Sequence, residues 1–211
     1  MFILNQQLEK DSFFITNINL SQLRLMNDAN YIWLILIPQE NNLKEFIDLS
    51  FSQQIVLLQE INLLSAILKQ NFPCDKINIA NLGNIVPQLH IHIIARKQND
   101  ITFPKPVWGN AEKIPYSSEN LKDICEKIKL FLQNHEKDLD KKITYRSLHR
   151  GCKETDFLLG KFTYQGNDKN TYLSFLSEDD MMIYDWILNK SEIPTIYQKI
   201  IEDIRNFHKI I

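Results

Sequence analysis

The alternation of polar and apolar residues between Gln88 and Arg96 constrains the fold of this chain more than any other feature. The segment is Gln-Leu-His-Ile-His-Ile-Ile-Ala-Arg, and its period of two predicts a half-buried β-strand. On such a strand Gln88, His90 and His92 share one face, and the apolar residues between them share the other. The chain has only five histidines, so two of them project side by side from one rigid element. Imidazole can act as a neutral nucleophile or a proton carrier near pH 7, and the pair therefore indicates a reactive site.

The part of the sequence around this strand predicts an α+β domain. A long helix is expected over residues 50–71, because Ser50 and Gln53 form a capping box before apolar residues at helical spacing. A second helix is expected over residues 118–133, and the pair Gly83-Asn84 predicts a tight turn before the histidine strand. The alternation and turn signals place strands at residues 13–20, 23–26, 32–38, 76–82 and 88–96.

A charged segment at residues 134–142 contains almost no apolar side chains and is the best candidate for a linker. After it the strand signals stop, and residues 143–211 have the pattern of short helices. We therefore predict two domains, an α+β domain over residues 1–138 and a small all-α domain over residues 139–211.

Charge, cysteine content and apolar runs limit the functional classes. The formal net charge of the 211-residue chain is −2, which gives no reason to expect a nucleic-acid partner. Three widely spaced cysteines without a CxxC pair indicate reduced thiols rather than a disulfide framework or a zinc site. The apolar start, residues 1–4, is too short for a signal peptide, and no apolar run approaches the ~18 residues of a membrane span. We expect a cytoplasmic protein without membrane insertion.

Two histidines on a strand beside a Gly-Asn turn favour phosphoryl chemistry. The turn at Gly83 and Asn84 offers backbone N–H groups to an anion, a neutral His90 can attack phosphorus, and His92 can stabilise charge on oxygen. Three alternatives remain open from the residues alone. The histidines could be two ligands of a zinc ion whose third ligand is not evident, they could be structural, or the site could bind nucleotides without chemistry.

The segment from Asn78 to Arg96 resembles the histidine triad (HIT) family of nucleotide hydrolases and transferases, whose signature is His-φ-His-φ-His-φ-φ with φ apolar. Residues 23–38 and Pro106-Val107-Trp108-Gly109 also resemble a bacterial branch of that family. The resemblance covers roughly residues 1–135 and implies a five-stranded antiparallel sheet with two helices, and a homodimer. It also implies roles for single residues: His90 is the nucleophile, His92 contacts phosphate, Gly83 and Asn84 form the phosphate-binding turn, and Asp28 holds the ribose hydroxyls.

The chain departs from the family signature at the first triad position, where Gln88 stands in place of histidine. Glutamine can hydrogen-bond a phosphate oxygen or a leaving group, but it cannot donate a proton and recover it at neutral pH. The departure predicts slow hydrolysis of an adenosine phosphoramidate, because its amine must leave protonated.

The second domain contains the sequence Arg150-Gly151-Cys152-Lys153-Glu154. Arg150 and Glu154 are four residues apart, so on a helix they could form an exposed ion pair. Gly151 favours another interpretation, because glycine inside a helix costs about 1 kcal/mol and often marks the close approach of another surface. A bare cationic patch beside that glycine then indicates docking to a partner, and composition alone does not decide between the two.

This segment resembles the Arg-Gly-x-x-Glu motif of the succinate dehydrogenase assembly factor 2 family, also called the FAD assembly factor family, and the likeness extends over about residues 141–211. The resemblance implies a five-helix domain that binds the flavoprotein subunit of succinate dehydrogenase and promotes covalent attachment of FAD to that client. Arg150, Gly151 and Glu154 would then face the client. We expect no permanently bound cofactor: FAD belongs to the client, and a nucleoside phosphate is the substrate of the first domain. The alternative is a HIT domain that only binds nucleotide, in a chain that acts purely as a flavinylation chaperone.

Overall fold

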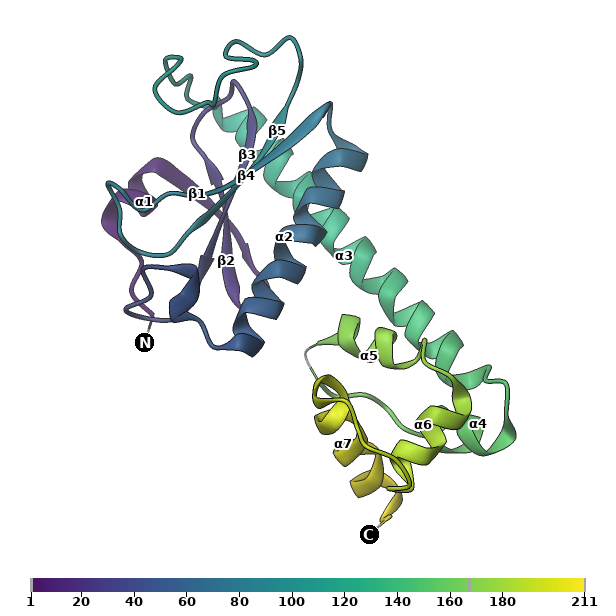
Figure 1. Ribbon diagram of the computed structural model, residues 1–211. Helices are drawn as coiled ribbons and strands as arrows, with labels where there is room; N and C mark the ends of the chain where they lie inside the picture. Colours follow the sequence, from purple (N-terminus) through teal and green to yellow (C-terminus); the bar gives the residue numbers. More distant parts are fainter. Residues whose placement is uncertain (1, 167, 211) are drawn as a thin grey trace. The chain divides into compact units, whose positions relative to one another are not determined.

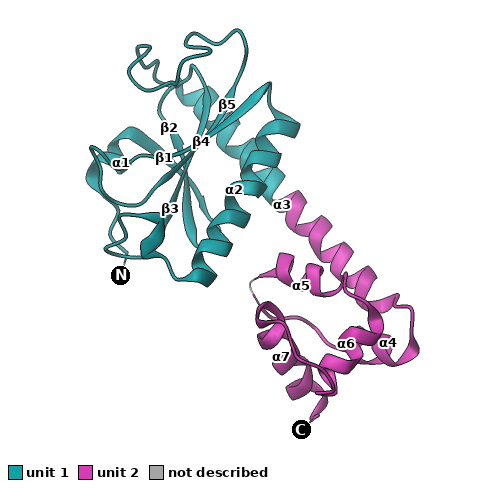
Figure 2. Cartoon of the chain, in the orientation of Figure 1, with its two compact units in different colours: residues 1–132 teal, residues 133–211 magenta. Residues whose placement is uncertain are grey.

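The computed structural model describes residues 2–166 and 168–210. The chain forms two compact units, residues 1–132 and 133–211 (Figure 2). Each unit has its own hydrophobic core, so each is described by itself.

Unit 1 is built on one antiparallel sheet with the strand order β1-β2-β3-β5-β4 (Figure 1). All four neighbouring pairs are antiparallel, and the predicted five-stranded antiparallel sheet is thus confirmed for the described part of the chain. The strands are β1 (Ser12–Asn17), β2 (Ser21–Met26), β3 (Ile32–Pro38), β4 (Lys76–Asn81) and β5 (Ile91–Arg96).

The long helix α2 (Phe51–Asn71) begins at the predicted capping box. The Ser50 side chain accepts from the backbone N–H of Gln53, and the Gln53 side chain accepts in return from the backbone N–H of Ser50. One face of the sheet packs against α2 and the first half of α3 (Ser118–Leu148). Their shared core includes Leu57, Leu64 and Leu68 of α2, Ile128 of α3, and Leu34, Leu36, Ile91 and Ile93 of the sheet.

Helix α2 is the one described helix that is long and apolar enough to cross a membrane by length and composition. The sequence prediction that no segment has this property was therefore wrong for α2. In the structure the helix places Leu57, Leu64 and Leu68 against the sheet, where all three are fully buried.

The opposite face of the sheet carries a second core cluster and both site histidines. This cluster contains Leu8 of the short helix α1 (Gln6–Asp11), Met26, Tyr31, Trp33, Ile35, Ile37, Ile94 and Val107. Four partly buried side chains pack against it, namely Phe2, Leu4, Val86 and Trp108. We call this surface the site face.

The strand boundaries near the histidines differ from the prediction. β5 begins at Ile91 and not at Gln88, and Gly83-Asn84 lies in a loop of nine residues, 82–90, rather than in a tight two-residue turn. One cause is that the backbone N–H of Leu89 bonds the carbonyl of Leu43, at 2.9 Å, so this part of the chain pairs with a loop and not with β4.

The charged segment at residues 134–142 is helical. It lies within α3, which runs without interruption from Ser118 to Leu148, so the prediction of a linker there was wrong. Two of its charged residues form ion pairs with Lys169, Glu136 at 3.3 Å and Asp140 at 2.8 Å. Its one leucine, Leu139, is buried.

The regular secondary structure of unit 2 is helical among its described residues, as predicted. It contains the second half of α3 and the helices α4 (Lys153–Gly160), α5 (Lys169–Phe175), α6 (Asp180–Ile187) and α7 (Gln198–His208), with a 3-10 turn at Thr195–Tyr197. Its core is rich in aromatic residues and includes Leu159, Tyr172, Phe175, Ile183, Trp186, Tyr197, Ile201 and Ile204.

Candidate functional site

His90 and His92 lie together on the site face of the sheet. In β5, which runs between β3 and β4, His92 is paired with Ile35 on one side and Ala80 on the other. His90 directly precedes this strand, and the two ring centroids are 4.8 Å apart. Only 5% of His90 and 3% of His92 is exposed. The predicted sharing of one face is therefore confirmed for the two histidines.

The hydrogen bonds of the two rings define their tautomers. His90 Nδ1 lies 2.6 Å from the carbonyl oxygen of Gln88; because a carbonyl only accepts, Nδ1 carries the proton and Nε2 keeps a lone pair. Trp33 Nε1–H donates to His92 Nδ1 at 2.9 Å, so a neutral His92 carries its proton on Nε2. The pair thus presents a nucleophilic nitrogen beside a hydrogen-bond donor.

Both histidines are neutral at pH 7 because burial disfavours the imidazolium form. Burial lowers the pKa of His90 below its usual value. Burial, followed by the charges of His90 and Lys113, lowers the pKa of His92 to about 3. A neutral imidazole is the form that can attack phosphorus.

Two tryptophans enclose His92. Its ring centroid lies 5.4 Å from that of Trp33 and 5.3 Å from that of Trp108, both in edge-to-face geometry. The two indoles also contact each other edge to face at 5.4 Å. This apolar wall excludes water from one side of the imidazole and accounts for its desolvation.

The side chain of Gln88 is directed at the N-terminal segment, and both ends of its amide are engaged. Gln88 Oε1 accepts from the backbone N–H of Asn5 at 2.8 Å, and Gln88 Nε2 donates to the carbonyl of Ile3 at 3.0 Å. The structure thus holds this amide, for which the sequence predicts contact with phosphate or a leaving group, on the N-terminal segment. Gln88 instead touches the site through its main-chain carbonyl, at His90.

The loop 82–90 exposes Gly83 and Asn84. Within the part of the chain that the structure describes, the backbone N–H groups from Gly83 to Val86 have no acceptor. The φ of Gly83 lies outside the left-handed region, and an added Cβ would meet only the Val86 carbonyl within 4 Å, at 3.9 Å, so its backbone is accessible. Exposed N–H groups without protein acceptors are what an anion-binding loop requires.

Asp28 is buried in the turn between β2 and β3, with 4% of its surface exposed. Its Oδ1 accepts from Asn30 Nδ2 at 2.8 Å and from the backbone N–H of Asn30 at 3.1 Å. None of the hydrogen bonds among the described residues joins Asp28 to either histidine. Here the carboxylate organises the turn that faces residues 112–116.

Lys113 is a site residue that the sequence pattern did not indicate. Its two neighbours are fixed to the Asp28 turn: the Glu112 carbonyl accepts from Asn30 Nδ2 at 3.0 Å, and the Ile114 carbonyl accepts from the backbone N–H of Ala29 at 2.6 Å. Lys113 is itself exposed, yet its charge acts on His92. No sequence signal marks it, because a lysine in a loop is ordinary.

The sequence pattern did not indicate Arg96 as a site residue either. Arg96 holds the loop that carries Trp108. Its guanidinium forms a bidentate pair with Asp100, at 2.7 and 2.9 Å, and bonds the Lys105 carbonyl at 3.0 Å. Both members of the pair are 2% exposed. Burial is the largest single effect on Asp100 and raises its pKa, but hydrogen bonds and the positive charge of Arg96 together outweigh it and lower the pKa to about 2.

Three or more His, Cys, Asp or Glu side chains do not come together as a possible metal site anywhere in residues 2–166 and 168–210. The two histidines of β5 therefore have no third ligand among the described residues, and the zinc alternative has no support in the geometry.

In unit 2, the structure corrects the predicted cationic patch at Arg150. The Arg150 side chain is only 7% exposed and its guanidinium pairs with Asp180 at 2.5 Å. It also donates to the carbonyls of Leu176 and of Glu178, the latter at 3.0 Å. Arg150 precedes α4, so the alternative of a helical ion pair with Glu154 is wrong as well. The guanidinium joins the start of α4 to the α5–α6 connection.

Another group does approach Gly151 closely, as its position in the sequence indicated, but that group is Asp180 of the same chain. The Gly151 backbone N–H donates to Asp180 Oδ2 at 2.5 Å, and a Cβ added at Gly151 would lie 2.7 Å from that oxygen. Arg150 and Gly151 are thus held by one carboxylate, which leaves no room for a side chain at residue 151.

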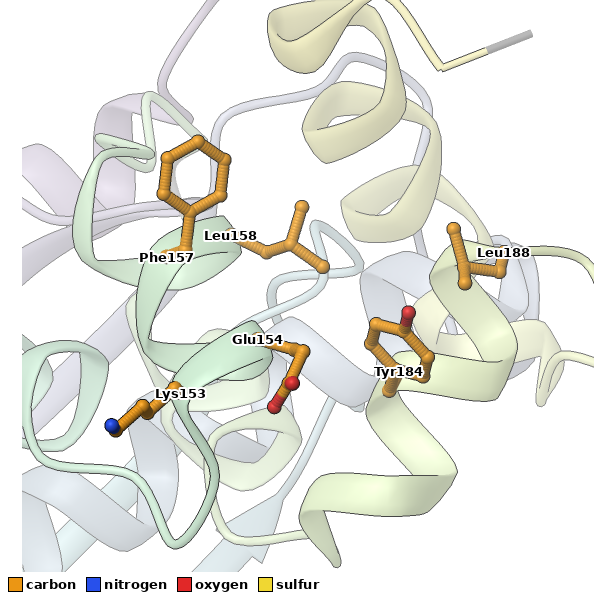
Figure 3. Close-up of a pocket in the computed structure, with 6 residues that line it drawn as sticks. All are labelled: Lys153, Glu154, Phe157, Leu158, Tyr184 and Leu188. Atoms are coloured by element: carbon orange, nitrogen blue, oxygen red, sulfur yellow. The ribbon is translucent and has the colours of Figure 1, made fainter.

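Glu154 is exposed to solvent. It lies on α4 at the edge of an open hollow of about 370 Å³ between α4 and α6, which we call the α4–α6 hollow (Figure 3). The hollow is lined by Lys153, Glu154, Phe157, Leu158, Tyr184 and Leu188. Its floor is mainly apolar, and 55% of Phe157 is exposed. The motif therefore separates into a structural part held by Asp180 and an exposed carboxylate beside an apolar surface.

Comparisons with known proteins agree with the division of the chain into two units. The HIT domain model matches residues 7–99, and the model described as flavinator of succinate dehydrogenase matches residues 141–208. The histidine triad protein of Bradyrhizobium japonicum is 40% identical, with a TM-score of 0.60, and the match covers 61% of this chain and 96% of that one. The corresponding protein of Marinobacter aquaeolei is 38% identical, with a TM-score of 0.62, over 64% of this chain and 98% of that one.

The C-terminal part matches a curated protein. The mitochondrial succinate dehydrogenase assembly factor 2 of Dictyostelium discoideum is 31% identical over 87 residues, which cover 37% of this chain and 62% of that protein. The present chain thus spans less than two thirds of the length of this relative. Its first part belongs to the histidine triad family, and its second part is a domain of the succinate dehydrogenase assembly factor 2 family.

Proposed function

We propose that the HIT domain binds a nucleoside phosphate derivative and transfers its nucleotidyl group through a covalent intermediate on His90. The observation that carries this proposal is the tautomer of His90. A buried, neutral imidazole has its Nδ1 proton held by the Gln88 carbonyl at 2.6 Å, which leaves the lone pair of Nε2 for attack.

In the first step the Nε2–P bond forms while the bond from phosphorus to the leaving group breaks, and the leaving group takes the bonding electron pair. In the second step water attacks the same phosphorus. The N–P bond then breaks, the imidazole recovers its lone pair, and the water proton is released with the nucleoside monophosphate.

The surrounding groups suit the charges of this reaction. The free backbone N–H groups at Gly83 and Asn84 can bind phosphate oxygens, and the Nε2–H of His92 can donate to the oxygen that gains charge. The positive charge of Lys113 acts on His92, whose pKa it lowers. We assign Asp28 to the ribose hydroxyls through its remaining oxygen, since its Oδ1 is engaged with Asn30.

A second candidate is a HIT domain that binds nucleotide but turns it over poorly. The engaged amide of Gln88 favours it, because this residue then offers no proton to an amine leaving group. Under this alternative the whole chain acts as a flavinylation chaperone.

Trapping of radiolabelled AMP on the full-length chain by an alkaline quench, after mixing with adenosine 5′-phosphoramidate, separates the two, because the P–N bond of a nucleotidyl-histidine survives base and is cleaved by acid. We expect label on the wild-type chain and on His135→Asn, a matched change of the exposed His135 in α3, and none on His90→Asn. Saturable AMP binding without label on the wild-type chain would favour the binding-only alternative.

We further propose that the C-terminal domain docks the flavoprotein subunit of succinate dehydrogenase and promotes covalent attachment of FAD to it. Support comes from the family match over residues 141–208 and from the exposed Glu154 beside the α4–α6 hollow. Phe157 and Tyr184 would supply the apolar part of the contact and Glu154 its charge. Arg150 and Gly151 would act indirectly, by holding α4 in place through Asp180.

Covalent flavin in the client, read as flavin fluorescence on a denaturing gel, tests this role. The change Glu154→Lys should lower client flavinylation and client capture, whereas Glu202→Lys, on the exposed face of α7, should leave both unchanged. A Gly151→Arg variant is unsuitable, because the clash with Asp180 disturbs the fold. Equal client flavinylation with Glu154→Lys and Glu202→Lys would contradict a contact between Glu154 and the client.

We also propose that the HIT domain forms a homodimer through the edge strand β4. That strand ends the sheet and exposes 53% of Ile79, followed by 37% of Leu82 and 90% of Ile85 in the next loop. A second copy covers such an edge well. Light scattering should give a dimer for the wild type and a monomer for Ile79→Lys.

A further inference from the structure

We infer that Gln88 is a positioning residue that fastens the N-terminal segment, residues 2–5, across one side of the histidine site. This inference rests on the proposed nucleotide function of the HIT domain. It gives the departure from the triad signature a structural role in place of proton donation.

The first support is the pattern of hydrogen bonds at the Gln88 amide. Its carbonyl oxygen accepts from Asn5 N–H and its amino group donates to the Ile3 carbonyl. One planar amide therefore bonds two backbone groups of the same segment, as a neighbouring strand would. Glutamine provides a donor and an acceptor at fixed spacing, whereas glutamate provides acceptors only.

The second support is the packing of the same segment on the site face. Phe2 and Leu4 pack against the core cluster that contains Trp33 and Val107, and so do Val86 and Trp108. Trp108 is also in ring contact with His92. The segment thus contributes to the apolar wall of the site, and Asn41 Oδ1 accepts from Ile3 N–H at 3.0 Å to hold its far end.

The third support is that Gln88 joins this segment to the nucleophile. The main-chain carbonyl of Gln88 accepts from His90 Nδ1–H, and its side chain holds residues 3 and 5. Fixing the side chain restricts the main chain at residue 88, and the restricted carbonyl keeps the His90 ring in the tautomer and orientation that direct Nε2 outward. Pre-organisation of this kind lowers the cost of reaching the reactive geometry.

A variant series of the full-length chain, labelled with ¹⁵N, tests the inference. The series comprises Gln88→Ala, Gln88→Glu, a deletion of residues 2–4, the two combinations of substitution and deletion, and Gln98→Ala as a control on an exposed glutamine. Three quantities are measured: amide exchange at Asn5, the ring ¹⁵N shifts of His90, and the affinity for AMP.

We expect Gln88→Ala and Gln88→Glu to speed exchange at Asn5 on the order of tenfold and to shift the ring nitrogens of His90. The deletion should produce the same ring shifts and weaken AMP binding roughly fivefold. Because Gln88 acts through the segment, neither substitution should weaken AMP binding further in the shortened chain. Gln98→Ala should match the wild type in all three quantities.

Two results would overturn the inference. One is exchange at Asn5 that is the same in Gln88→Ala as in Gln98→Ala. The other is a further loss of AMP affinity when Gln88→Glu is added to the deletion, which would show direct contact between residue 88 and phosphate. Failure of the wild-type chain to form the nucleotidyl-histidine contradicts the proposed chemistry alone, since the exchange and ring-shift comparisons need no turnover.

Discussion

The carboxylate of Asp180 shows how one side chain can fix the identity of a residue 29 positions away, Gly151. It accepts from the backbone N–H of Gly151 and pairs with the buried guanidinium of Arg150. The oxygen cannot move away from an added Cβ without loosening both contacts. A buried arginine left without its partner is costly, so glycine at residue 151 is required by the internal packing of unit 2.

A first prediction concerns Gly151→Ala. The new Cβ would lie 2.7 Å from Asp180 Oδ2, and we expect the free energy of unfolding of unit 2 to fall by about 1–3 kcal/mol. Gly83→Ala is the matched control, because its added Cβ meets nothing closer than 3.9 Å. Urea denaturation measures both, and equal midpoints for the two variants would contradict the close approach.

A second prediction concerns the charge at Lys113. Replacing it by methionine removes a positive charge that lowers the pKa of His92. We therefore expect a higher pKa of His92, closer to the usual histidine value, and AMP binding weakened by roughly tenfold. NMR titration of the His92 ring and calorimetry with AMP provide the two values. Lys105→Met, a change of another exposed lysine in the same connection, serves as the control.

At the scale of elements, α3 shows how far a local pattern can mislead. Residues 134–142 are charged and poor in apolar side chains, as linkers often are. Helix formation there is favoured by ion pairs with Lys169 and by burial of Leu139, and neither effect is visible in the segment alone. The same composition serves a solvated helix face as well as a linker.

A third prediction follows from this helix. Lys137 is exposed within α3, and Lys137→Pro should remove helical signal in circular dichroism and destabilise unit 2 by about 3 kcal/mol, because proline breaks the hydrogen bonding of a helix interior. Lys137→Ala should be neutral or slightly stabilising. A proline variant as stable as the alanine variant would mean that this segment is not helical in solution.

At the scale of the whole molecule, the two units have separate cores. Every buried residue of the sheet cores lies at or before Ile128, and the helical core begins at Leu158. A loss of packing in one core therefore leaves the contacts of the other intact. We extend the first prediction accordingly: Gly151→Ala should lower client flavinylation at elevated temperature while the affinity for AMP stays unchanged.

A fourth prediction concerns the pH dependence of stability in unit 1. The pKa values of His90 and His92 are lowered in the folded state, so below about pH 6.5 the unfolded chain binds more protons. The stabilising effect of the neutral rings is complete above that pH and is lost as the pH falls toward 3. His92 contributes a slope of up to roughly 1.4 kcal/mol per pH unit in this window, and the lowered pKa of His90 adds a slope of the same sign below pH 6.5.

Denaturant unfolding of unit 1 between pH 7 and pH 4 measures the slope. His92→Gln should reduce it, because glutamine can still accept from Trp33 but does not titrate. An identical slope in the variant would show that His92 binds protons equally in both states.

Much of the fold could be predicted because the deciding signals are local. The capping box at Ser50 and Gln53 placed the start of α2, and the alternation around His92 placed both histidines on one face. The boundaries of β3 agreed with the prediction at both ends. The start of β5 did not, because Leu89 bonds to Leu43, far away in the sequence.

The sequence by itself determined the two families, the sheet, the helical second domain and the identity of the histidine pair, since periodicity and short motifs are properties of neighbouring residues. Only the tertiary structure decided what Gln88, Arg150, Gly151 and Lys113 do. Gln88 binds residues 83 and 85 positions away, and Arg150 pairs with a carboxylate 30 positions away. Such partners are chosen when the chain folds, because a hydrogen bond depends on distance in space and not on distance along the sequence.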